Sequence, residues 1–255
     1  MTRRLLFMLT ASAAVAAAQW LNYPAPGIPR LPDGRPNLAA PTPRTADGKP
    51  ELDGIWFVDE KPLDEFGIRS AGSSLEIKPE DIVLTPEGKA LQQRMKNDFP
   101  GAQCLPVNIA GLAGAQPFKI YSGRGAVVIL YEVLTLYRQI FVDGRPLPKD
   151  PNPTWLGYSV GKWDGDTLVV ETSGFNDRVP VPGGRPHSDA LHMRERFRRL
   201  DFGHLEIQYT IDDPKVYAKP WTIKQGLHLT PDTELLEYVC NENEKDRRHM
   251  VGSDK

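Results

Sequence analysis

The chain of 255 residues lacks several of the short motifs that mark common classes of enzyme. It has no HExxH pair, no glycine-rich phosphate loop and no CxxC pair. These absences argue against a zinc peptidase, a nucleotide-binding enzyme and a dithiol redox protein. The residues therefore indicate no particular cofactor, and the cofactor question stays open.

Positive charge and long apolar segments are also scarce. The chain carries 31 basic and 33 acidic residues, so no basic excess favours nucleic acid or an anionic membrane surface. The longest uncharged, mostly apolar run covers residues 5–18, which is shorter than the roughly 20 residues that a membrane-spanning helix needs. We expect neither a nucleic-acid partner nor a membrane span, and the oligomeric state stays open.

The first 18 residues have the pattern of a cleavable signal peptide. Arg3 and Arg4 precede the apolar run, which ends in three alanines before Gln19. The paired arginines also fit the twin-arginine pathway, so the general secretory and twin-arginine routes both stay open. Without residues 1–18 the chain has 29 basic and 33 acidic residues, a net charge of −4. We expect a periplasmic or secreted protein.

The two cysteines, Cys104 and Cys240, suit an oxidising compartment. An even pair in an exported chain predicts a disulfide between them. Two separate buried thiols are the alternative.

Residues 19–53 form a proline-rich arm. Eight of the 24 prolines fall between positions 24 and 50. Because proline fixes φ and removes a backbone donor, neither a helix nor a central strand is expected there. We predict an extended, polyproline-like arm that lies on the following domain or tethers it. No internal repeat of fixed period is apparent.

Residues 54–240 have the pattern of a single β-rich domain, followed by a polar tail at 241–255. One helix is expected near 86–97, with Thr85 as its N-cap and Pro86 in its first turn. Short turns join the expected strands, which favours antiparallel neighbours and a closed, up-and-down, calycin-like barrel; a strongly bent sheet is the alternative. The expected strands are 54–59, 118–121, 126–132, 134–143, 155–163, 166–172, 191–200, 204–211, 221–229 and 235–240.

His187 is the first candidate for chemistry. It lies in a loop before an expected strand, with Asp189 close by, and could act as a general base. The alternative is an ordinary histidine of a surface loop. A metal site formed by His187 and His192 lacks a third ligand at useful spacing, so we expect no metal site.

The second candidate is Glu195, on an alternating strand. Leu191, Met193, Glu195, Phe197 and Arg199 share the face that is expected to point inward. A buried carboxylate must be paired, most simply with Arg138, or protonated. Such inward charges indicate either an ion-pair ladder that fixes strand register or a pocket for a polar ligand. The residues expected to line such a pocket are Tyr131, Arg138, Glu171, Tyr217 and Trp221.

Three segments resemble a family of exported bacterial proteins of unassigned function. They read "WLGYSVGKWDGDTLVVETSGFND", "HSDALHMRERFRRLDFGHLEIQYTIDDPKVYAKPWT" and "LLEYVCNENEKD", and the arm with "DGKPELDGIW" resembles the openings of the same proteins. The resemblance covers nearly the whole mature chain and implies export and a β-rich fold, but no substrate. Where that family has a tryptophan soon after "FND", this chain continues from Arg178 to Pro182 without one.

Three functions fit these observations. The first is an extracytoplasmic barrel that binds a small, partly apolar ligand. The second is a periplasmic hydrolase or lyase in which His187 and Glu195 perform acid–base chemistry, with Arg138 as an anion partner. The third is a structural protein of the cell envelope whose arm docks to a partner. A solid, internally paired core favours the third function, whereas an open cavity with unpaired carboxylates favours the first two.

Overall fold

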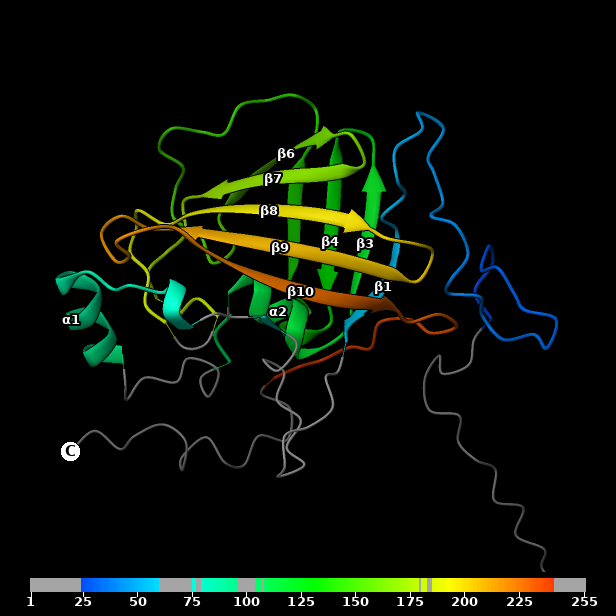
Figure 1. Cartoon of the computed structure of the whole chain (residues 1–255), viewed down its shortest axis with the longest axis horizontal. Coiled ribbons are helices and arrows are strands. Elements are labelled where there is room, and N and C mark those ends of the chain that lie inside the picture. The colour runs from blue at the N-terminus through cyan, green and yellow to red at the C-terminus, as the bar shows by residue number, and fades with distance from the viewer. Residues whose placement is uncertain are drawn as a thin grey trace, which may run out of the picture.

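A computed structural model describes residues 24–59, 75–76, 79–95, 104–106, 108–178, 180–182 and 185–240 (Figure 1). The predicted signal peptide, the start of the arm and the polar tail lie outside the described residues.

The described chain is mainly β and forms a closed barrel of nine strands, which confirms the predicted fold class. The barrel closes because β1 pairs with both β3 and β10. The two-residue β2 (Leu75–Glu76) continues the same edge of β10 beyond β1. The barrel strands, in their order around the sheet, are β1 (Gly54–Val58), β3 (Phe118–Gly123), β4 (Ala126–Tyr131), β5 (Tyr137–Phe141), β6 (Tyr158–Asp164), β7 (Thr167–Ser173), β8 (His192–Arg199), β9 (His204–Asp212) and β10 (Trp221–Leu229).

Alternation along each strand creates the core. On β8 the inward residues are Met193, Glu195, Phe197 and Arg199, so the predicted strand face is confirmed. The β6–β7 hairpin turns at Gly165, whose φ of +57° suits the Asp-Gly turn expected there. The alternation therefore places one line of side chains from every strand inside a single core.

One strand pair departs from the expected up-and-down pattern. β5 and β6 run parallel, and only two register pairs join them: Ile140 with Ser159, and Phe141 with Val160. The connection between the two strands, residues 142–157, is long enough to return the chain to the same end of the sheet, as a parallel pair requires. All the other barrel pairs are antiparallel.

Two other expected strands are shortened or missing. The strand predicted at 134–143 begins only at Tyr137, because Val133–Thr135 forms a 3-10 turn with positive φ at Leu134 and Thr135. The segment 235–240, also predicted as a strand, has no regular secondary structure and runs to the disulfide. Apolar side chains made both segments resemble strands, but the first pairs with β4 only from Tyr137 onward, and 235–240 pairs with no strand among the described residues.

The described residues contain two α-helices where one was expected. α1 (Pro86–Met95) begins as predicted, with the Thr85 hydroxyl accepting a hydrogen bond from Gly88 N at 3.0 Å. A Cβ atom at Gly88 would lie 2.3 Å from the carbonyl oxygen of Val216, so only glycine permits this helix to pack so closely. α2 (Ile109–Ala115) is capped by Asn108 and is buried against β1.

The arm contains a tandem repeat, although no fixed period was expected in the chain. Residues 29–38 read PRLPDGRPNL and residues 43–52 read PRTADGKPEL. Each copy folds into the same turn: in the first, Leu31 N donates to Arg35 O and Asn37 N to Pro29 O. The second makes the equivalent bonds 14 positions later, and both glycines adopt positive φ. The prediction that the chain lacks an internal repeat is therefore wrong.

The repeated arginines attach the arm to the barrel. Arg30 forms two hydrogen bonds with Asp232, after β10, and Arg44 forms two with Asp166, in the β6–β7 turn. Each arginine also donates to the glycine carbonyl of its own repeat. The arm therefore lies across the end of the barrel where β8 ends, as the blue segment in Figure 1 shows.

The middle and end of the arm belong to the folded core. Phe202 N donates to Ala40 O at 2.8 Å, and Gly203 N donates to Leu38 O at 2.7 Å. Leu52, the last residue of the second repeat, is only 1% exposed. The turn between β8 and β9 therefore holds the arm through backbone hydrogen bonds, and Leu52 anchors it by burial.

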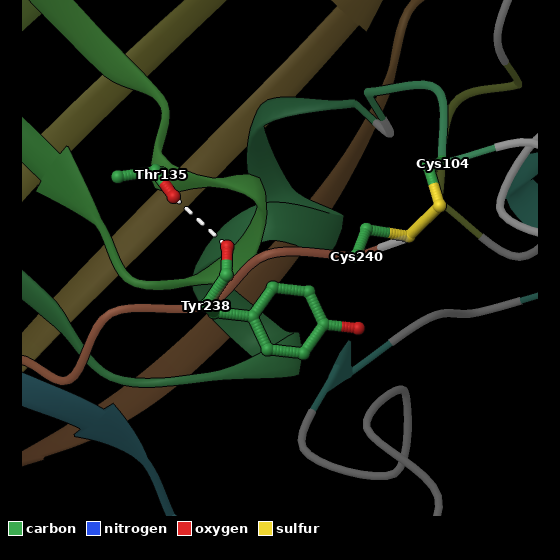
Figure 2. Close-up of a disulfide and its surroundings, with 4 residues drawn as sticks. All are labelled: Cys104, Thr135, Tyr238 and Cys240. Atoms are coloured by element: carbon green, nitrogen blue, oxygen red, sulfur yellow. Dashed lines mark hydrogen bonds between the residues drawn. A yellow bond between two sulfur atoms is a disulfide. The ribbon is translucent and has the colours of Figure 1, made fainter. Parts of the chain in front are cut away.

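The predicted disulfide is present between Cys104 and Cys240 (Figure 2). It joins the segment before α2 to the segment that follows β10. Close by, the Thr135 hydroxyl donates to Tyr238 O at 2.9 Å, which holds the last described segment against the turn before β5.

We expect the Cys104→Ser/Cys240→Ser double variant to lose up to about 5 kcal/mol of unfolding free energy, because the bond closes a long loop in the unfolded chain. Its loop spans a sequence separation of 136 residues. Urea unfolding of the oxidised protein and the double variant measures the difference. Non-reducing peptide mapping checks the pairing, and two free thiols in the native protein would contradict it.

Candidate functional site

The barrel interior contains a buried ion pair between Arg138 on β5 and Glu195 on β8. Their side chains are 1% and 0% exposed. The two groups meet side by side: Arg138 Nη1 donates to Glu195 Oε1 at 2.9 Å, and Nη2 donates to Oε2. This geometry is the bidentate pairing that makes arginine the best partner for a buried carboxylate. The predicted inward position and pairing of Glu195 are confirmed.

Two hydroxyl groups complete this pair. Arg138 Nε donates to the Ser159 hydroxyl at 3.1 Å, and Nη2 donates to the Thr172 hydroxyl at 2.9 Å. The two hydroxyls also lie 3.0 Å apart. Burial acts to lower the pKa of Arg138, but the charge of Glu195 and its hydrogen bonds outweigh that effect and raise it. The Arg138 guanidinium therefore stays charged inside the core.

Tyrosines and a glutamine extend the polar layer. The Tyr209 hydroxyl donates to Gln225 Oε1 at 3.0 Å, while Gln225 Nε2 is buried with no hydrogen-bond partner among the residues that the structure describes. Burial raises the pKa of Tyr131 to about 12 and that of Tyr209 well above its ordinary value. Both phenols are therefore neutral at physiological pH and sit beside the ion pair.

His187 belongs to a second cluster, at the end of the barrel where β8 begins. It is 2% exposed and packs edge-on against Phe175, so it is not the surface-loop histidine of the alternative interpretation. Its neighbour Ser188 is held through both its backbone N–H and its hydroxyl, which donate to the carboxylate of the buried Asp213. Both carboxylate oxygens of Asp213 therefore accept hydrogen bonds from Ser188 at this end of the barrel.

The aromatic candidates Tyr217 and Trp221 lie at the same end as His187. Their rings meet edge-to-face with centroids 5.5 Å apart. The Tyr217 hydroxyl donates to the carbonyl oxygen of Pro186 at 2.6 Å, next to His187 in the chain. Burial raises the pKa of Tyr217 above its ordinary value.

The structure thus divides the predicted site residues among three places. Tyr131, Arg138 and Glu195 share the barrel interior. His187, Tyr217 and Trp221 share the end where β8 begins, and the hydrogen bond and the ring contact that His187 makes among the described residues are with Ser188 and Phe175, not with Glu195. Glu171 lies on the outer face of β7, where it pairs with Arg194 at 2.6 Å and His192 at 3.1 Å. The acid–base roles of His187 and Glu195 stay a prediction that this separation does not favour.

Two hollows open at opposite ends of the barrel. One, of about 330 Å³, lies between the arm and the ends of β1, β8 and β10. The other, of about 340 Å³, lies between α1 and the loops that contain Phe175 and His187. Sequence reasoning missed the first, because only the folded arm creates it.

Among the described residues, no three His, Cys, Asp or Glu side chains gather as a metal site would require. None of the described helices is long and apolar enough to cross a membrane.

No model of a known protein family matches the chain, and no curated protein is significantly similar to it. The resemblance to exported bacterial proteins therefore stays a prediction.

We expect Glu195→Gln to cost about 3–5 kcal/mol of unfolding free energy, because it leaves Arg138 charged and unpaired in the core. Replacing both partners, as Arg138→Met/Glu195→Leu, should recover most of that loss. Glu171→Gln is the matched surface control and should cost less than about 1 kcal/mol. Urea unfolding measures all three. A neutral Glu195→Gln variant would contradict the buried pairing.

We expect alkaline pH to destabilise the protein through its buried phenols. The pKa of Tyr131 is raised to about 12 in the folded state. Its stabilising contribution is therefore complete below about pH 10, the unfolded value, and is lost as pH rises toward 12. Between pH 9 and 11.5, the unfolding free energy of Tyr131→Phe should fall by about 2 kcal/mol less than that of the native protein. Urea unfolding measures both. Tyr137→Phe, at an exposed site, should not change it.

Proposed function

We propose that the protein is an exported, extracytoplasmic binding module that holds a small, partly apolar ligand in the hollow between its arm and its barrel. The observation that supports this proposal is the hollow itself. At about 330 Å³ it falls in the size range of small-molecule pockets. We place the protein in the periplasm or outside the cell on the signal-peptide pattern, with which the disulfide is consistent.

The walls of the hollow suit a ligand with one apolar side. Ile28 and Pro43 of the arm face Ile55, Phe202 and Leu229 of the barrel across it. Polar groups stand at the rim, where Lys119 pairs with Glu234 at 2.7 Å. An apolar wall with a few polar groups is the usual composition of a small-molecule site.

Arg199 lines the hollow and is held firmly by its neighbours. Its guanidinium donates to the backbone carbonyls of Glu51 and Phe202 and lies over the rings of Trp56 and Phe202. Burial lowers the pKa of Arg199 to about 10, against the opposing effect of nearby carboxylates. Because its donors are directed at main-chain oxygens, Arg199 holds the arm and the end of β8 together around the hollow.

The other two functions have less support. The barrel interior pairs its own charges, so Arg138 and Glu195 direct their charges at each other and not at a ligand. The arm uses Arg30 and Arg44 on its own barrel, rather than presenting them to a partner. The predicted acid–base residues, His187 and Glu195, lie in different parts of the barrel.

We expect the fluorescent probe 8-anilinonaphthalene-1-sulfonate, which is partly apolar, to bind the native protein with one-to-one stoichiometry. Ile28→Glu should weaken that binding at least about tenfold, because it places a charge in the apolar wall. Tyr121→Glu is the control: Tyr121 is 59% exposed on the outer face of β3 and should leave binding unchanged.

Fluorescence titration measures the affinity, and urea unfolding establishes that each variant is folded. Native mass spectrometry of protein purified from its own compartment then looks for a retained small molecule. Equal binding by the native protein and Ile28→Glu, with no retained molecule, would overturn the proposal.

A further inference from the structure

We propose a second binding site at the other end of the barrel, where Nε2 of His187 accepts a hydrogen bond from a hydroxyl group of a small neutral polyol or sugar. This site is separate from the hollow under the arm. His187 precedes the first residue of β8 and Arg199 is its last, and eight strand residues span about 26 Å.

A single hydrogen bond determines the form of the imidazole. His187 Nδ1 lies 2.9 Å from the carbonyl oxygen of Ser188. A carbonyl oxygen only accepts hydrogen bonds, so Nδ1 must carry the proton. In the neutral ring, Nε2 then has a free lone pair and acts as an acceptor.

Nε2 is left available at the hollow. Nε2 has no hydrogen-bond partner among the described residues. The unpartnered polar side-chain atoms that are fully buried there do not include it. The atom therefore has accessible surface, although the residue as a whole is 2% exposed. His187 lines the hollow of about 340 Å³, and the proposal places the accessible surface of Nε2 on it.

The histidine is held rigidly in this orientation. Phe175 packs against the ring with centroids 6.3 Å apart. On either side of it in the chain, Pro186 is held by the Tyr217 hydroxyl, and Ser188 by Asp213. An acceptor fixed in this way loses little entropy when a ligand arrives.

The charges around the hollow favour a neutral ligand. Its walls carry three carboxylates and two cations, and one of those cations, Lys215, pairs with Asp189 at 2.6 Å. The two other carboxylates outnumber the one other cation, so the hollow disfavours an anion. A hydroxyl donates to Nε2 and also accepts from a cation, so a ligand with several hydroxyls satisfies both kinds of group. The charged residues are Glu87, Arg94, Asp177, Asp189 and Lys215.

The first experiment determines the tautomer and the ligand class. Long-range ¹H–¹⁵N correlation spectra of the imidazole groups should show His187 protonated on Nδ1 at pH 8. Titration with myo-inositol and D-ribose should shift the His187 Nε2 resonance in a saturable way. Acetate and methylammonium, which test an anion and a cation, should not.

Two substitutions separate the nitrogen atoms. His187→Asn keeps an amide donor near the position of Nδ1 and removes Nε2, so it should weaken polyol binding about tenfold or more. His187→Gln places an amide oxygen near the position of Nε2 and should keep part of the affinity. His228→Asn, on β10 far from this loop, is the matched control and should bind as the native protein does.

Binding by these variants is measured through the backbone amide shifts of residues 175–177 and 188–190, and cooperative urea unfolding establishes that each is folded. An Nε2-protonated His187 would overturn the proposal. So would saturable shifts with methylammonium alone, no shift with either polyol, or equal binding by His187→Asn and the native protein.

Discussion

The buried ion pair of Arg138 and Glu195 spans the two barrel strands that are joined by the fewest register pairs. Only two register pairs join β5 to β6. From β5, Arg138 reaches Ser159 on β6, Thr172 on β7 and Glu195 on β8, so one side chain connects four consecutive strands. Because an unpaired charge in a core is so costly, every one of these strands must keep its register to satisfy the guanidinium. The polar layer thus specifies how the sheet closes, where backbone hydrogen bonds alone are few.

The periodicity of the sequence was sufficient to predict this ion pair. It did not predict the parallel pairing of β5 with β6, which the ion pair spans. The alternation of β8 places Glu195 among Met193 and Phe197, and a buried carboxylate must be paired or protonated, with Arg138 as the most plausible of the inward bases. A parallel pairing depends on how residues 142–157 travel through space, and no local pattern records that path. The helix α2 was not predicted, for a related reason. Its sequence, IAGLAGA, is apolar on every side, so it lacks the amphipathic period by which a helix is recognised.

The two candidate binding regions differ in how far local sequence could indicate them. The loop position of His187 drew attention to it, but the residues that hold it in place, Phe175, Tyr217 and Asp213, are distant in sequence. The hollow under the arm could not be predicted while the arm was expected to be merely extended. Its prolines concealed two copies of one turn, since a repeat of 14 residues is shorter than the periods of common repeat folds. Only the matching bonds of Arg30 and Arg44 make the duplication obvious.

The pairing of β1 with β10 has a consequence for synthesis. Trp56 of β1 lies opposite Leu229 of β10. The first barrel strand to be synthesised therefore pairs along one of its edges with the last. Contacts between residues so distant in sequence close slowly, because the entropy of a long loop must be lost first. Until residue 229 has been made, β1 has at most its β3 edge satisfied and leaves the other edge open to any extended chain nearby. A chain built in this order keeps that edge of β1 open, and available to a chaperone, until β10 has been synthesised.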